Sequence, residues 1–195
     1  FSVQDHLNSV RTRVERLLTL EALTPLHEEV GAFARAQLGP VLDRIEAEIL
    51  TSLNHGDMEK PLTTSDRVLS PSDFGFHNAL ESKGEIHFLD FEYAGWDDPS
   101  KLTCDFVCQP DHPLDLELAR LFVKDMCTAL DSTMSEERVE SLLPLHRLKW
   151  CCIIMNGFRG MEWSEPSSTG MVEVDVLRSQ LLKASAYFDE HLAQF

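Results

Sequence analysis

The segment from Leu69 to Phe106 constrains this chain more than any other part of it. Within it, Asp73, Asn78 and Asp90 stand five and then twelve residues apart. An apolar run typical of a strand leads into Asp90 and contains Ile86, Phe88 and Leu89. Phosphoryl transfer uses such a set of oxygens, because one carboxylate orients the attacking hydroxyl while an amide oxygen and a second carboxylate hold magnesium on the nucleotide phosphates.

The sequence motifs around these positions resemble those of the aminoglycoside phosphotransferase and choline kinase family, which has a protein-kinase-like fold. The family pattern reads roughly HGDxxxxN, a short strand, (I/L)D(F/W)E, AG and then DP. This chain reads Ser70-Pro71-Ser72-Asp73, then Asn78, and then LDFEYAGWDDP over residues 89–99. The family's His-Gly is Pro71-Ser72 here, a change that bears on loop geometry more than on the chemistry of Asp73.

The resemblance implies an ATP-dependent phosphotransferase, a kinase that moves the γ-phosphoryl group of ATP to a hydroxyl of a small molecule. It makes Asp73 the catalytic base and makes Asn78 and Asp90 ligands of Mg²⁺. Without the resemblance, Asp73 is an ordinary turn-forming residue ahead of a glycine-bearing loop. Two other classes stay open: a kinase-like binding module without catalysis, and a metal-dependent phosphohydrolase that uses Asp73, Asp90 and Asp97 or Asp98.

Three further acids follow the second motif. Glu92 stands two residues after Asp90, so on an extended segment both side chains share a face and Glu92 is an extra metal ligand or a support for one. Asp97 and Asp98 precede Pro99. We expect them either to contact a cationic substrate or to cap the helix that follows. Asp105 matches a family residue that holds the catalytic loop, which predicts a structural role.

The histidines near the motif are not expected to take part in the chemistry. His55-Gly56-Asp57 matches the family's HGD motif. The motif also requires Asn five residues after the Asp, but position 62 is Leu, so we expect a surface loop there. His77 and His87 flank a predicted hairpin, and we expect both to be structural, because no third imidazole stands at metal-binding spacing.

Apolar periodicity predicts a mainly α fold with a small antiparallel β-hairpin layer, an α+β class that resembles the C-terminal lobe of a kinase-like fold. The predicted helices cover 2–22, 24–38 with an end at Gly39-Pro40, 41–53, a stretch after Pro99, 114–130, a stretch from Ser135, 145–158 and 172–192. Predicted loops cover 54–66 and 162–170. Short strands are predicted at 67–70, 78–81 and 85–89, the last two joined by Ser82-Lys83-Gly84.

We therefore expect a single lobe over 1–195, with helical parts at 1–60 and 100–195 and the catalytic and metal-binding loops at 67–99. No glycine-rich loop precedes Asp73, and no lysine precedes Lys60. The nucleotide clamp of a kinase N-terminal lobe is thus absent from this chain. The chain alone is expected to be inactive and to bind ATP–magnesium weakly.

The composition of the chain limits which classes of partner it is expected to bind. The net charge is −16 and no basic stripe exists, which argues against nucleic acid. This acidity suits steering of a cationic small molecule, although solubility alone also accounts for it. No apolar run approaches the ~20 residues that span a bilayer, which argues against a membrane protein. The five cysteines contain no CxxC, which indicates reduced thiols in a cytoplasmic protein.

Overall fold

The computed structural model describes residues 1–52, 58–130, 134–159 and 168–195. These residues form two compact units. The first unit contains Phe1–His6 and Ile49–His146, and the second contains Leu7–Glu48 and Arg147–Phe195. The predicted loop at His55-Gly56-Asp57 lies outside the described residues, as does most of the loop predicted at 162–170; its last residues, 168–170, begin a helix.

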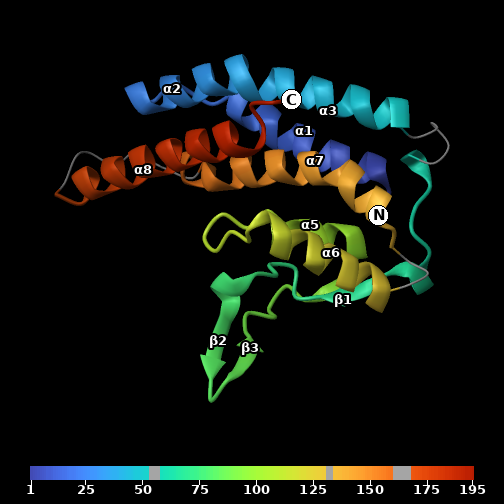
Figure 1. The fold of residues 1–195 in the computed structure, drawn as a ribbon. Helices are drawn as coiled ribbons and strands as arrows, with labels where there is room; N and C mark the ends of the chain where they lie inside the picture. Colours follow the sequence, from blue (N-terminus) through green and yellow to red (C-terminus); the bar gives the residue numbers. More distant parts are fainter. Residues whose placement is uncertain (53–57, 131–133, 160–167) are drawn as a thin grey trace. The chain divides into compact units, whose positions relative to one another are not determined.

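The described residues are mostly helical and form two small antiparallel sheets, which confirms the α+β class (Figure 1). The helices are α1 Val3–Leu18, α2 Pro25–Phe33, α3 Gly39–Ser52, α5 Pro99–Val107, α6 Leu116–Ala129, α7 Glu136–Ile154 and α8 Ser168–His191. The strands are β1 Val68–Ser70, β2 Ala79–Ser82, β3 Glu85–Phe88 and β4 Gly95–Asp97. No helix of the described residues is both long enough and apolar enough to cross a membrane.

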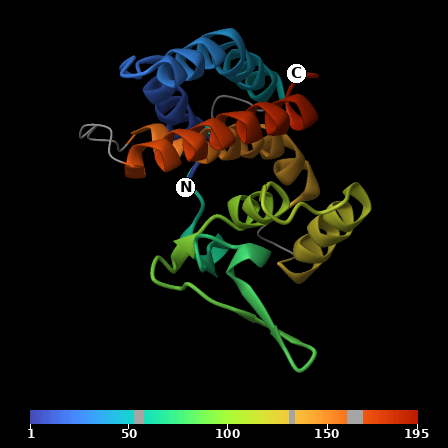
Figure 2. The ribbon, with the colours of Figure 1, turned by 90° about the vertical axis from the view of Figure 1, so that its left-hand side faces the viewer.

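The second unit contains helices and connecting turns but no strand over its described residues (Figure 2). Its helices bury apolar side chains at helical spacing, among them Leu7, Val10, Val14, Leu17, Val30, Leu38, Ile45, Leu148, Leu177 and Phe188. Two contacts fix α8 against its neighbours. Phe33 meets Phe188 edge to face with ring centroids 5.6 Å apart, and the Cys151 thiol lies 3.4 Å from the Ala184 carbonyl oxygen.

Several predicted helix boundaries are wrong. The helix predicted over 2–22 ends at Leu18, and the helix predicted from residue 172 begins at Ser168. The chain does not end a helix at Gly39-Pro40, because a π-helical turn, Ala34–Leu38, runs directly into α3. The Gly39 amide donates to the Ala34 carbonyl, and this wider turn lets the helical path continue into Pro40, which lacks an amide hydrogen. The helices predicted from Ser135 and over 145–158 are one helix, α7, which contains Pro144 and ends at Ile154.

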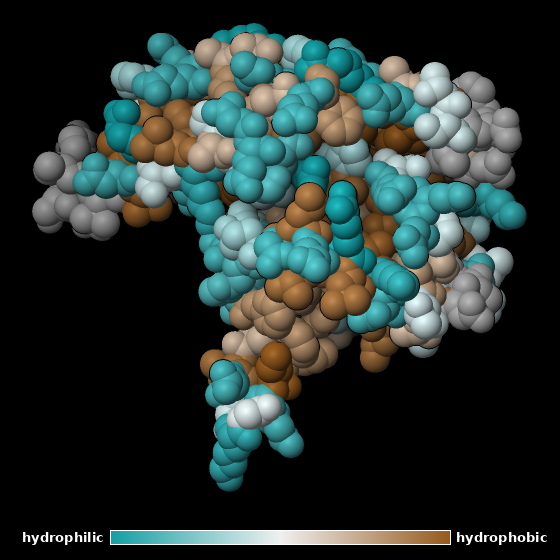
Figure 3. Space-filling model, in the orientation of Figure 1, coloured by the Kyte–Doolittle hydropathy of each residue, from teal (hydrophilic) through white to brown (hydrophobic). Residues whose placement is uncertain are grey.

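The first unit carries both sheets. β1 pairs with β4, so that Leu69 lies opposite Trp96, and β2 pairs with β3 as a hairpin. Lys83 and Gly84 join β2 to β3 with φ angles of 55° and 79°, as a tight two-residue hairpin turn requires. The hairpin prediction is therefore confirmed, and the space-filling view shows hydrophilic side chains covering its tip (Figure 3).

All five cysteines are free thiols in the structure. Cys151 and Cys152 are buried on α7, as predicted. Burial raises the pKa of the Cys151 thiol well above its ordinary value and raises the pKa of Cys152 to about 12.

We expect these two thiols to be unreactive until the protein unfolds. A pKa of about 12 reduces the thiolate fraction of Cys152 by roughly 10³-fold relative to an ordinary thiol, and the thiolate is the reactive form. Titration with a thiol reagent should find five thiols in unfolded, non-reduced protein. A count below five would reveal a disulfide, and rapid labelling of Cys152 in the folded protein would contradict its burial.

Candidate functional site

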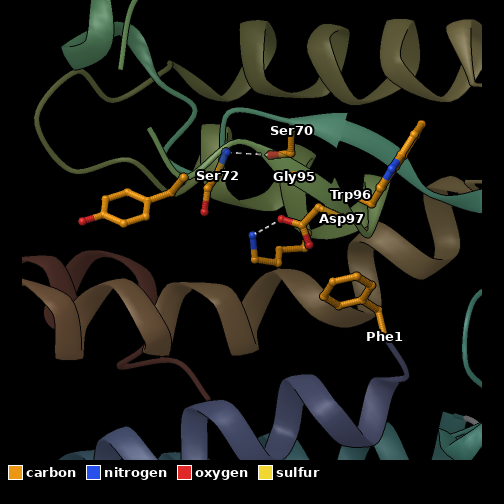
Figure 4. Close-up of a pocket in the computed structure, with 8 residues that line it drawn as sticks. Phe1, Ser70, Ser72, Gly95, Trp96 and Asp97 are labelled. Atoms are coloured by element: carbon orange, nitrogen blue, oxygen red, sulfur yellow. Dashed lines mark hydrogen bonds and ion pairs between the residues drawn. The ribbon is translucent and has the colours of Figure 1, made fainter. Parts of the chain in front are cut away.

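The loop that carries Asp73 is fixed on its N-terminal side by a strained turn. Ser72 has a φ of 74°, in the left-handed region that side chains other than glycine seldom adopt. Its amide donates to the hydroxyl of buried Ser70, 3.0 Å away, at the end of β1 (Figure 4). Ser70 therefore holds the turn that delivers Asp73.

The C-terminal side of the same loop is fixed by aromatic packing. The centroid of the Phe74 ring lies 4.8 Å from the ring centroids of both Phe88 and Phe106. The centroid of the Phe76 ring lies 5.1 Å from that of Phe106. Phe106 is buried on α5 and stacks on Phe122 of α6 at 4.3 Å. These rings tie the loop after Asp73 to two helices and to the hairpin.

Asn78 connects Asp73 to the hairpin. Its side-chain Nδ2 donates to the backbone oxygen of Asp73 at 2.9 Å. Its own backbone oxygen accepts from the Leu89 amide at 2.8 Å, which extends the β2–β3 ladder by one pair. Asp90, the next residue, therefore follows the strand at the end of the hairpin where Asn78 lies. The structure thus brings Asn78 together with Asp73 and places Asp90 at the same end of the ladder.

Asp90 and Glu92 do not lie on one extended segment, so that expectation is wrong. Asp90 has a φ of 59°, and the Ala94 amide donates to the Phe91 carbonyl at 3.0 Å, which closes a turn around Glu92. Aspartate tolerates the left-handed region better than most residues. Both acids are exposed, and the turn removes the shared face on which a joint role was argued.

Asp97 and Asp98 are buried, and both are engaged within the first unit. Asp97 Oδ2 pairs with the ammonium group of Lys101, four residues later in α5. Asp97 Oδ1 accepts a hydrogen bond from the Asp98 amide at 2.9 Å. Asp98 accepts from the Ser100 amide at 2.8 Å and so caps α5. Capping is one of the two roles expected for Asp98. A fully buried carboxylate is not open to a substrate.

Two side chains, His6 and Arg138, converge on Asp98. His6 Nε2 lies 2.9 Å and an Arg138 guanidinium nitrogen 2.7 Å from the same carboxylate oxygen, Oδ2. Burial opposes ionisation, but the hydrogen bond from His6 and the Arg138 charge outweigh it, so the pKa of Asp98 lies well below its usual range. Asp98 is therefore a structural anion.

Asp105 is also buried, as its predicted structural role requires. It lies 3.0 Å from His146 Nδ1 and 3.4 Å from Lys101 Nζ. Burial opposes protonation of Lys101, but the charges of Asp105 and Asp97 prevail and raise the pKa of Lys101. The three residues tie α5 to α7 within the first unit.

A pocket of about 270 Å³ adjoins the Asp73 loop through Ser72 (Figure 4). Its lining residues are Phe1, Ser70, Ser72, Tyr93, Gly95, Trp96, Asp97 and Lys101. Of the acids expected to contact substrate, only Asp97 lines it, and Lys101 neutralises the charge of that carboxylate. The pocket therefore offers aromatic surface and serine hydroxyls more than free negative charge.

His77 has a contact that the sequence did not predict. Its Nε2 lies 3.1 Å from Asp73 Oδ2, and its Nδ1 lies 2.6 Å from Gln109 Nε2. Asp73 and His77 are four residues apart, with the short helical turn Phe76–Asn78 beginning between them. That spacing was visible in the sequence, but a turn there was not expected. Gln109 follows α5 and is brought to His77 only by the fold.

Asn78 carries an amide oxygen and Asp90 a carboxylate, and both groups are of kinds that can bind magnesium. Magnesium is commonly bound by one or two carboxylates together with phosphate oxygens and water. Among the described residues, no group of three or more His, Cys, Asp or Glu side chains is arranged to hold a metal ion. Comparisons of the chain with family models, curated proteins and solved structures gave no match.

Proposed function

We propose that this chain is the catalytic C-terminal lobe of a phosphotransferase that moves the γ-phosphoryl group of ATP to a hydroxyl of a small molecule. The observation that carries the proposal is the hydrogen bond from Asn78 Nδ2 to the Asp73 backbone oxygen. Since this bond uses the amide nitrogen, the amide oxygen remains for a cation. The same residue sits beside Asp90 through the ladder bond to Leu89.

Backbone strain supports the same assignment. Among the described residues, three other than glycine have positive φ: Ser72, Lys83 and Asp90. The hairpin turn accounts for Lys83. The remaining two are Asp90 itself and the residue before Asp73. Such strain costs about 1–3 kcal/mol for each residue and is concentrated at functional sites.

The proposed roles follow from position and exposure. The Asp73 side chain is 51% exposed, so a substrate hydroxyl can reach it, and its carboxylate would orient that hydroxyl and accept its proton. Asn78 and Asp90 would hold Mg²⁺ on the ATP phosphates, where the ion offsets phosphate charge. The pocket beside Ser72 would receive the acceptor molecule.

The decisive experiment measures phosphoryl transfer by the full-length protein. With ATP, Mg²⁺ and a panel of small alcohols that includes amino alcohols, we expect ADP and a phosphate monoester in equal amounts by ³¹P NMR. ATP binding without transfer to any acceptor would instead support the binding module. Turnover of phosphate esters without ATP would support the phosphohydrolase.

Replacing Asp90 with alanine is expected to weaken magnesium-dependent ATP binding by at least about 10-fold, because one of two protein ligands is lost. Calorimetric titration of the full-length protein with ATP, with and without Mg²⁺, measures the effect. Glu92→Ala is the matched control, since Glu92 is also exposed and stands only two residues away. Equal loss in both variants would mean that general negative charge, and not ligation by Asp90, is what matters.

A further inference from the structure

We propose that His77 is a positioning residue for Asp73, held in a single tautomer by Gln109. The proposal rests on the function proposed above for Asp73, but its structural part can be tested without any substrate. Three side chains carry it. Gln109 is buried at 3% exposure, the His77 side chain is 20% exposed, and the Asp73 side chain is 51% exposed.

The tautomer of His77 follows from the hydrogen-bonding groups around it. The backbone N–H of Asp111 can only donate, so the Gln109 atom that it meets is the amide oxygen. The Gln109 NH₂ group therefore faces His77 Nδ1, 2.6 Å away. Because an NH₂ group only donates, Nδ1 accepts and carries no proton. The proton of the neutral ring is then on Nε2.

Nε2 is the nitrogen that lies 3.1 Å from Asp73 Oδ2, within the range of an N–H···O hydrogen bond. The ring therefore presents a donor to one carboxylate oxygen of Asp73. Oδ2 is engaged by His77, which leaves Oδ1 for the acceptor hydroxyl. An exposed carboxylate would otherwise turn freely about its side-chain bonds, and orientation of the reacting group contributes strongly to rate.

Gly75 shows how closely this arrangement is packed. A Cβ at Gly75 would lie 2.7 Å from His77 Nδ1 and 2.8 Å from Gln109 Cγ. Its φ of 178° is ordinary extended backbone, so contact with the His77–Gln109 pair, and not backbone strain, requires glycine here. Gly75→Ala therefore separates the pair without altering either side chain.

The first test reads the tautomer directly. In protein with ¹⁵N-labelled histidine at about pH 8, where an ordinary imidazole is neutral, two-bond ¹H–¹⁵N spectra distinguish protonated from unprotonated ring nitrogens. We expect His77 with the proton on Nε2. Gln109→Leu removes the donor to Nδ1 while keeping an apolar stem, so it should raise the fraction of rings with the proton on Nδ1, while the Asp73 carboxylate still favours a proton on Nε2. A proton on Nδ1 in the unaltered protein would overturn the proposal.

The second test uses phosphoryl transfer by the full-length protein. His77→Ala is expected to lower kcat about 10- to 100-fold with little change in the KM for ATP, since orientation and not nucleotide binding is lost. His77→Gln should recover most of kcat, because glutamine also offers a donor and an acceptor. Gly75→Ala and Gln109→Leu should both lower kcat, and His87→Ala, an exposed imidazole on β3, should not.

The outcomes separate the two proposals. If the unaltered protein transfers no phosphoryl group, the proposed function fails, while the ring spectra still decide whether Gln109 fixes the tautomer. If transfer occurs but His77→Ala leaves kcat unchanged, the positioning role is wrong. If His77→Gln loses as much activity as His77→Ala, His77 acts through a titrating proton and not by holding Asp73.

Discussion

Replacing Asp73 with asparagine is expected to lower kcat for phosphoryl transfer by about 10²- to 10⁴-fold in the full-length protein. Asparagine keeps the size of the side chain but cannot accept the proton of the acceptor hydroxyl. Affinity for ATP should change little, because Asn78 and Asp90, and not Asp73, are the proposed metal ligands. Initial-rate kinetics and calorimetric ATP titration of the same variant measure both quantities.

Asp125→Asn is a suitable control for that experiment, since it makes the same chemical change on an exposed position of α6. It should retain the activity of the unaltered protein. Asp73→Asn with an unchanged kcat would remove Asp73 from the mechanism. Loss of ATP affinity equal to the loss of kcat would show that Asp73 contributes to the nucleotide site instead.

Replacing Asp98 with alanine is expected to lower the free energy of unfolding by about 3–5 kcal/mol, the usual cost of removing one partner from a buried ion pair. The substitution leaves the Arg138 guanidinium and His6 without their shared acceptor and removes the cap of α5. Denaturant unfolding followed by circular dichroism gives the value.

Asp115→Ala is the matched control, because Asp115 also caps a helix of the first unit, α6, but is exposed. Losing an exposed cap costs about 1 kcal/mol. The difference between the two variants isolates the contribution of burial and ion pairing at Asp98. Equal losses in both would mean that Asp98 contributes only as a cap.

The ionisation of Asp98 also predicts a dependence of stability on pH. Because the pKa of Asp98 is lower in the folded protein than in the unfolded chain, its contribution is fully present above the unfolded value of about 3.9. That contribution is lost as pH falls below this value toward the folded pKa. Asp98→Asn should therefore show a shallower loss of stability on the acid side than the unaltered protein, and an unchanged slope would contradict the shifted pKa.

Features set by neighbouring residues could be predicted from the sequence. Two short strands predicted on either side of Ser82-Lys83-Gly84 form the hairpin, and the helix predicted from Ser135 is found as α7, where the Arg138 amide donates to the Ser135 hydroxyl at 3.2 Å. The same reasoning failed at Gly39-Pro40. Glycine and proline usually end a helix, but a π-helical turn just before them lets the chain continue, and no local pattern announces that turn.

The parts of the site that were not predicted depend on contacts between distant residues. Gln109 reaches His77 across 32 positions, and nothing near either residue indicates the pairing. The spacing of Asp73, Asn78 and Asp90 predicted oxygens near one another, but not the left-handed backbone at Ser72 and Asp90. Sequence spacing identifies candidate groups, whereas their orientation depends on a fold that brings remote segments together.

The contact between His6 and Asp98 has a consequence for the order in which this protein can fold during synthesis. The two residues are 92 positions apart, and the first six residues belong to the same unit as Ile49–His146. On the ribosome, His6 emerges well before its partner has been made. Domains generally fold as units while the chain is being made. Residues 1–6 therefore cannot complete the buried cluster of His6, Asp98 and Arg138 until at least Asp98 and Arg138 have left the exit tunnel.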